Sequence, residues 1–130
     1  MQRRLIAEGV GTALLLTAVV GSGIMAERLS GGNNAIALLA NAIATGAALY
    51  PLILSFDGLS GAHFNPAVSL VMGINGELRW RLVAPYALVQ TAGAIAGVWL
   101  AHLMFDMPIL QTSPKLRTGI GQWAGEQTKT

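Results

Sequence analysis

Cysteine is absent from the 130-residue sequence, and charged residues make up only 11% of it. The absence of cysteine excludes disulfides, thiolate metal sites and cysteine nucleophiles within these residues. An ordinary soluble domain carries about 25% charged residues, so a water-soluble surface is difficult to build from this composition. The eight Lys and Arg residues are spread over segment ends without a cluster that could follow a phosphate backbone. We therefore expect no nucleic acid partner.

Three apolar stretches are long enough to cross the core of a lipid bilayer, which requires about 20 residues of helix. We predict one transmembrane helix in each, over residues 5–26, 35–56 and 83–105. The first stretch could instead be a signal peptide with Arg3 and Arg4 as its basic front, but its apolar run is too long and Glu8 lies inside it. A soluble three-helix bundle is the other alternative. It is disfavoured because these helices are apolar nearly all round.

The connections between these stretches predict a hairpin followed by a re-entrant segment. Residues 28–34 are short and rich in turn formers, which favours antiparallel packing of the first two helices. Gly58, Ser60 and Gly61 are expected to break the second helix. We predict that residues 57–76 enter the membrane and return to the same face, as irregular backbone does only where it is buried in protein or lines water.

A short apolar run inside this segment has the signals of a half-helix. Residues 67–74 are too few to span, and residues 75–76, Asn-Gly, end the run. Asn65 is a favoured helix cap, and Pro66 suits the first helical position, where its missing N–H group costs nothing. Such a half-helix would direct unpaired N–H groups and about half a positive charge into the membrane, which repels cations and protons.

Residues 60–69 read Ser-Gly-Ala-His-Phe-Asn-Pro-Ala-Val-Ser. This segment resembles the first Asn-Pro-Ala box of the major intrinsic protein family, the aquaporins and aquaglyceroporins. Further similarities fall in the first and third apolar stretches, at Ala7, Glu8, Gly11, Thr12, Gln90, Gly93 and Gly97. The resemblance extends over residues 4–126.

This resemblance implies an all-α membrane protein with three transmembrane helices and one re-entrant half-helix, which together form one aquaporin-like inverted repeat over residues 1–106. It implies passive passage of water and small uncharged solutes, with no enzymatic activity, cofactor or metal. The box residues are Asn65, Pro66 and Ala67. The side-chain amide of Asn65 would face a passing oxygen, and the carbonyls of Gly61, Ala62 and His63 would offer a ladder of acceptors.

Other positions receive roles by the same resemblance. In the family, the residue twenty positions before the box asparagine contributes to the selectivity constriction, which here is Thr45. Strict water channels resemble each other in an aromatic residue there, so Thr45 predicts a wider constriction that passes glycerol or metalloid acids. Glu8 is expected to accept hydrogen bonds from the re-entrant backbone, although an intramembrane carboxylate is also a functional candidate by default. Gln90 is expected to be a polar brace.

Two further patterns allow more than one interpretation. Gly93 and Gly97 form a Gly-x-x-x-Gly face, which allows close helix contact but also arises by chance in a glycine-rich chain. Four aromatic residues are expected to be interface anchors or packing groups: Tyr50, Trp80, Tyr86 and Trp99.

The family is built from two inverted repeats, and the sequence contains one Asn-Pro-Ala box. Residues 122–126 resemble the opening of a second repeat, within a loop or tail over residues 107–130. The sequence therefore resembles a truncated or split channel that needs a second half, either an antiparallel copy or a separate chain, with a tetramer implied by the family. Basic residues at both faces give only a weak orientation bias: Arg3, Arg4, Arg79 and Arg81 on one, Arg28, Lys115 and Arg117 on the other. The composition suits a bacterial inner membrane.

Two other functional classes remain open at this point. A non-conducting structural or interaction protein would share the same fold. An intramembrane hydrolase built from Asp57, Ser60 and His63 is the other option. Their close spacing in one loop gives no separate scaffold to orient a base, which argues against it.

Overall fold

The computed structural model describes residues 1–106, and these residues contain four helices in the order α1 to α4. The helices are α1 (Gln2–Leu29), α2 (Asn34–Ser60), α3 (Pro66–Ile74) and α4 (Trp80–Met104). Of the described helices, α1, α2 and α4 are long and apolar enough to cross a membrane, and α3 is not. The predicted all-α fold, with three spanning helices and one half-helix, is confirmed.

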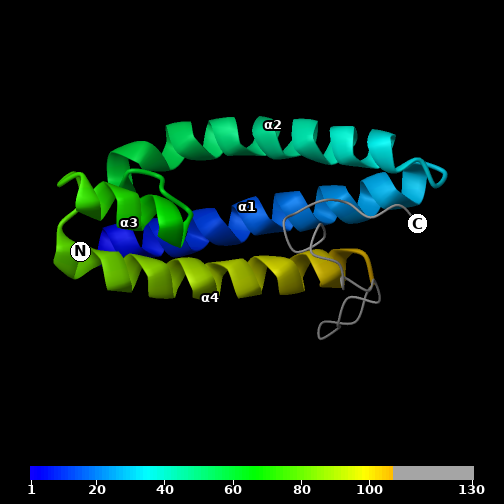
Figure 1. The fold of residues 1–130 in the computed structure, drawn as a ribbon. Helices are drawn as coiled ribbons and strands as arrows, with labels where there is room; N and C mark the ends of the chain where they lie inside the picture. Colours follow the sequence, from blue (N-terminus) through cyan, green and yellow to red (C-terminus); the bar gives the residue numbers. More distant parts are fainter. Residues whose placement is uncertain (107–130) are drawn as a thin grey trace, which may run out of the picture.

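The long helices lie side by side with α1 in the middle (Figure 1). Helix α1 packs against both α2 and α4, and α3 packs against α4. Helices α1 and α4 begin at the same end and run in the same direction, whereas α2 runs back between those ends (Figure 1). Helix α3 lies beside the first half of α4 and points its N-terminal tip toward the middle of the molecule (Figure 1).

Glycines let α1 and α4 approach until their backbones touch. A Cβ atom added to Gly93 would lie 2.2 Å from the carbonyl oxygen of Gly9, and one added to Gly97 would lie 2.3 Å from that of Ala13. The hydroxyl of Thr17 also donates across the interface to the carbonyl of Gly97, at 3.1 Å. The Gly-x-x-x-Gly face is therefore a true contact face.

The second helix extends further than the sequence predicted. Gly58, Ser60 and Gly61 were expected to break it, but α2 continues through Gly58, has Ser60 as its last residue and is capped by Gly61. A glycine inside a helix costs about 1 kcal/mol relative to alanine, which is too little to stop a long membrane helix. The real stop is Gly61, whose φ of +90° lies in the left-handed region that favours glycine. The irregular segment therefore begins at residue 61 and not at 57.

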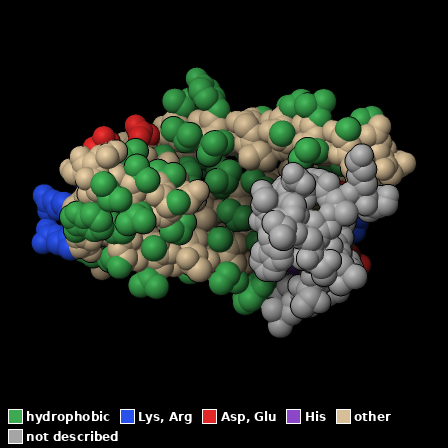
Figure 2. Space-filling view, viewed as in Figure 1, with side chains coloured by type: hydrophobic (Ala, Val, Ile, Leu, Met, Phe, Trp, Pro, Cys, Tyr) green, Lys and Arg blue, Asp and Glu red, His purple; other side chains and the backbone are tan. Residues whose placement is uncertain are grey.

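Basic residues mark the end where α1 and α4 begin (Figure 2). Arg3, Arg4, Arg79 and Arg81 are all exposed there. Arg28 lies at the opposite end of α1, where its guanidinium group donates to the carbonyl of Phe105 at 3.1 Å. Lys115, Arg117 and the predicted tail over residues 107–130 lie outside the described residues.

Candidate functional site

The segment between α2 and α3 has a strained backbone. Gly61 has a φ of +90°, but Ala62 and Phe64 also have positive φ values, +50° and +53°. A non-glycine residue in this region costs on the order of 1–3 kcal/mol, and it persists only where surrounding contacts hold it. The segment therefore needs strong contacts with the rest of the molecule.

The carboxylate of Glu8 supplies most of these contacts. Glu8 is fully buried in α1. Its Oε1 atom accepts hydrogen bonds from the Ser60 hydroxyl at 2.6 Å and from the backbone N–H of His63 at 3.0 Å. Its Oε2 atom accepts from the backbone N–H of Phe64 at 2.8 Å and from Nε2 of Gln90 at 2.9 Å. Four donors saturate the carboxylate, so this one side chain joins α1, the loop and α4.

A second set of polar side chains surrounds the carboxylate. The Tyr86 hydroxyl donates to the carbonyl of Ser60 at 2.8 Å. The hydroxyl of Ser69 in α3 lies 3.0 Å from both Nε2 of Gln90 and Nδ1 of His63. Tyr86 is completely buried, so it is a packing residue and not an interface anchor. Packing was one of the two roles expected for it, but its hydrogen bond to Ser60 was not predicted, although Tyr86 and Gln90 are four residues apart and share one helix face.

Phe64 sets the depth to which the loop enters the molecule. Its side chain is only 4% exposed and meets the ring of Phe56 edge-on, with 5.9 Å between the ring centroids. It also packs against α1 at Gly11, where an added Cβ atom would lie 2.0 Å from Cε1 of Phe64. Gly11 lies about 14 Å from the start of α1 at 1.5 Å per residue. The loop therefore reaches well inside the depth of the spanning helices.

The N-terminal tip of α3 is exposed at this depth. The side-chain oxygen of Asn65 accepts the N–H of Ala67 at 2.9 Å, and Pro66 occupies the first turn. Asn65, Pro66 and Ala67 are all exposed. No described residue accepts a hydrogen bond from the amide nitrogen of Asn65 or donates one to the carbonyls of residues 61–63. The tip thus presents a free amide donor beside open acceptors, which suits a neutral hydrogen-bonding molecule.

Thr45 is not in contact with this tip. It lies in α2 fifteen residues before Ser60, about 22 Å along the helix axis. The Thr45 side chain is half-buried, and its hydroxyl donates to the carbonyl of Asn41 at 2.8 Å. Between the described parts of α2 and α3 there is no helix contact. The structure brings Glu8, His63 and Gln90 together and leaves Thr45 apart.

The residues of the hydrolase alternative do not form a nucleophile and base pair. The Ser60 hydroxyl donates to Glu8, and Nδ1 of His63 lies against Ser69. Asp57 is exposed in the last turn of α2. These contacts hold the loop in place, and no hydrogen bond joins Asp57, Ser60 and His63 to one another.

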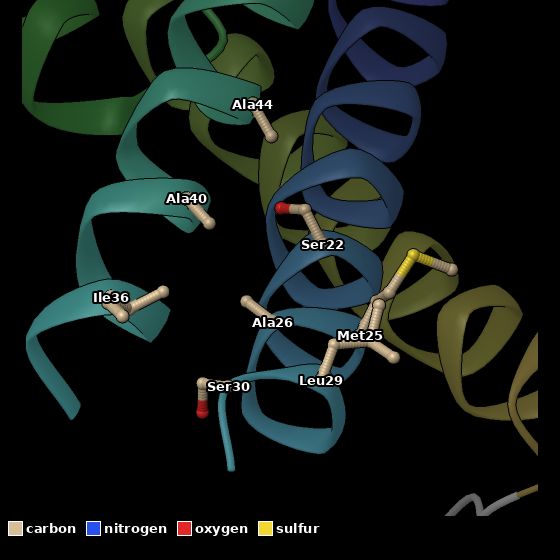
Figure 3. Close-up of a pocket in the computed structure, with 8 residues that line it drawn as sticks. All are labelled: Ser22, Met25, Ala26, Leu29, Ser30, Ile36, Ala40 and Ala44. Carbon is tan, nitrogen blue, oxygen red and sulfur yellow. The ribbon is translucent and has the colours of Figure 1, made fainter. Parts of the chain in front are cut away.

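An apolar groove lies between the C-terminal part of α1 and the beginning of α2 (Figure 3). Its volume is about 280 Å³, and its lining includes Met25, Leu29, Ile36, Ala40 and Ala44. Ser22 and Ser30 are the polar side chains in its lining. A groove of this composition offers little to a polar solute.

Comparisons with known proteins match most of the chain. A family model described as "Major intrinsic protein" matches residues 1–125. The chain is 57% identical over 126 residues to Aquaglyceroporin AqpS of Rhizobium meliloti (strain 1021). The matched region covers 97% of the chain and 54% of that protein. It is 37% identical over 113 residues to Aquaporin NIP1-4 of Oryza sativa subsp. japonica, and the matched region covers 85% of the chain and 40% of that protein.

A third relative is Aquaporin Z of Brucella melitensis biotype 1, which is 35% identical over 104 residues, covering 80% of the chain and 45% of that protein. The chain spans about half the length of the curated relatives that it matches. No solved structure matches it.

Proposed function

This chain belongs to the major intrinsic protein family, and we propose that it forms one half of a membrane channel for water and small uncharged solutes. The single observation that carries the proposal is the tip of α3, a capped but exposed helix start held inside the depth of the spanning helices by Glu8. The relatives named as aquaporins and an aquaglyceroporin support it.

The tip supports selective passage of neutral molecules. A helix N-terminus carries about half a positive charge, which opposes cations and protons. The free amide nitrogen of Asn65 offers donors, and the carbonyls of Gly61, Ala62 and His63 offer acceptors. A small hydroxylated solute would replace its lost hydration on these groups, and no covalent step is required.

The exposure of the tip also supports pairing with a second repeat. Polar backbone that faces hydrocarbon costs several kcal/mol per unpaired group, and residues 65–67 are exposed in this repeat taken alone. We propose that a second repeat covers this face, in an antiparallel copy, in a separate chain or in a longer form of this one. Assembly of such pairs into a tetramer and insertion into a bacterial inner membrane are part of the same proposal.

The channel proposal can be tested on two levels. Reconstitution into liposomes with stopped-flow light scattering should show water and glycerol entry above protein-free vesicles. Because the chain has no cysteine, Ala62→Cys gives a single reporter on the loop, and a water-soluble thiol reagent should label it in intact membranes. Labelling without flux is the result expected of a non-conducting interaction protein, and equally of a half-channel whose second half is a separate chain. Absence of both would end the channel interpretation.

The width of the channel gives a further prediction at Thr45. Thr45→Phe should lower glycerol permeability by about tenfold or more and water permeability much less, because an aromatic ring narrows the path. The measurement is the ratio of glycerol to water permeability in vesicles. Ile43→Phe is the control, since Ile43 is 63% exposed two residues away. Unchanged glycerol permeability in Thr45→Phe would show that Thr45 does not line the constriction.

A further inference from the structure

An asparagine in the first third of α2 has no role in the site described above. Asn41 is half-buried, and its Oδ1 atom accepts a hydrogen bond from the Ser22 hydroxyl at 2.8 Å. Figure 3 shows this hydroxyl pointing from α1 toward α2. The same hydroxyl lies 3.1 Å from the carbonyl of Val19. Ser22 therefore holds one end of the Asn41 amide and fixes its orientation.

The other end of the amide remains open. No described residue accepts a hydrogen bond from Nδ2 of Asn41, and within residues 1–106 the buried side-chain polar atom without a partner is Oε1 of Gln90. The Nδ2 group is therefore not sealed inside the repeat. Asn41 is half-buried beside α1, where a Cβ atom added to Gly23 would lie 3.6 Å from Nδ2, so the amide keeps unused donor capacity next to the contact between α1 and α2.

Asn41 and Thr45 form one polar unit on α2. The hydroxyl of Thr45 donates to the backbone carbonyl of Asn41 at 2.8 Å, so Thr45 has used its donor and keeps acceptor capacity only. Asn41 adds the donors that Thr45 lacks. The two residues are four apart and share one face of the helix, with Asn41 about 6 Å nearer the connection between α1 and α2.

The opposite face of α2 is the one that suits lipid. Leu39 and Ile43 are 62% and 63% exposed and lie on the far side of the helix from Asn41 and Thr45. An amide that faced hydrocarbon without a partner would cost a few kcal/mol. Water, a polar solute or a polar group of the second repeat would supply the partner that this amide lacks within residues 1–106.

We propose that Asn41 is a specificity-determining residue, whose open amide nitrogen donates hydrogen bonds to small uncharged solutes that carry several hydroxyl groups. This inference rests on the proposed channel function. Such a solute would meet donors at Asn41 and acceptors at Thr45 within one helical turn. Water needs fewer simultaneous contacts, so Asn41 favours the larger hydroxylated solute.

Cysteine labelling tests the position without any need for flux. Asn41→Cys should react with a water-soluble thiol reagent at least about tenfold faster than Ile43→Cys, because thiolate reactions require access of water. Glycerol should slow the reaction at position 41. Equal rates at the two positions would overturn the proposal. If Ala62→Cys reacts and Asn41→Cys does not, this inference fails alone; if neither reacts, the channel function fails with it.

Flux measurements separate a solute contact from a helix brace. Asn41→Leu should lower the ratio of glycerol to water permeability by about three- to tenfold, the effect of one or two neutral hydrogen bonds. Ser22→Ala removes the brace but leaves the amide, and should change the ratio by less than about twofold. If the ratio of glycerol to water permeability fell equally in Asn41→Leu and Ser22→Ala, Asn41 would only join α1 to α2. The same conclusion would follow if Asn41→Leu lowered water and glycerol permeability by the same factor.

Discussion

Glu8→Ala should destabilise the protein by about 3–5 kcal/mol, because several buried donors lose their acceptor at about 1–3 kcal/mol each. The carboxylate accepts from the Ser60 hydroxyl, two loop N–H groups and Gln90. Its loss leaves these donors buried without an acceptor and releases a loop that contains strained Ala62 and Phe64. The half-helix tip should then lose its position, and solute flux should be abolished. Thermal unfolding in detergent and stopped-flow flux measure the two effects.

Two companion variants show whether the loss of the hydrogen-bond network, and not the loss of a carboxylate alone, causes the destabilisation of Glu8→Ala. Glu77→Ala removes an exposed carboxylate from the connection between α3 and α4 and should change stability by less than about 0.5 kcal/mol. Glu8→Gln keeps the shape but replaces one acceptor oxygen by a donor, so it should fall between wild type and Glu8→Ala. A Glu8→Ala protein with wild-type stability and flux would contradict the structural role of the carboxylate.

Gly93→Val should separate α1 from α4 and destabilise the protein by about 3 kcal/mol or more, because overpacking forces the backbone to shift. An added Cβ atom at Gly93 would lie 2.2 Å from the Gly9 carbonyl oxygen. The obstacle is backbone, which cannot rotate away as a side chain can. Since Glu8 and Gln90 sit beside this contact on the same two helices, the shift should also stretch their 2.9 Å hydrogen bond. Thermal unfolding and Ala62→Cys labelling report both consequences.

Gly46→Ala is the matched control for the glycine contact. Gly46 also lies in a spanning helix, but an added Cβ atom there would meet nothing within 4 Å. This variant should be neutral or stabilising by up to about 1 kcal/mol, since alanine favours helix. If Gly93→Val were tolerated as well as Gly46→Ala, the close approach of α1 and α4 would not be needed for stability.

The sequence was informative where one residue type has one strong physical meaning. Long apolar runs predicted α1, α2 and α4, and Asn65 followed by Pro66 predicted the start of α3. Gly58 misled because a single glycine inside a long apolar helix is a weak breaker, and only the positive φ at Gly61 distinguishes a stop from a tolerated residue. Helix boundaries depend on backbone geometry that composition does not specify.

The polar network around Glu8 was only partly accessible from the sequence. The resemblance gave the backbone partners of Glu8 and a bracing role for Gln90, but Ser60, Ser69 and Tyr86 were not assigned to the network. Hydroxyl groups form hydrogen bonds in so many contexts that spacing alone rarely identifies their partners. The unused donor of Asn41 was not predicted either, because it becomes evident only from the hydrogen bond between Asn41 and Ser22 of another helix.

The partners of the Glu8 carboxylate are separated from it in the chain by 52 to 82 residues. Helix α1 precedes all these partners in the chain, so its buried acid lacks them until the loop and then Gln90 on α4 have been synthesised. Helix α3 packs only against α4 among the described helices, so it also lacks a docking surface until α4 arrives. The half-helix is therefore synthesised before α4, but it gains its helix partner only once α4 is present.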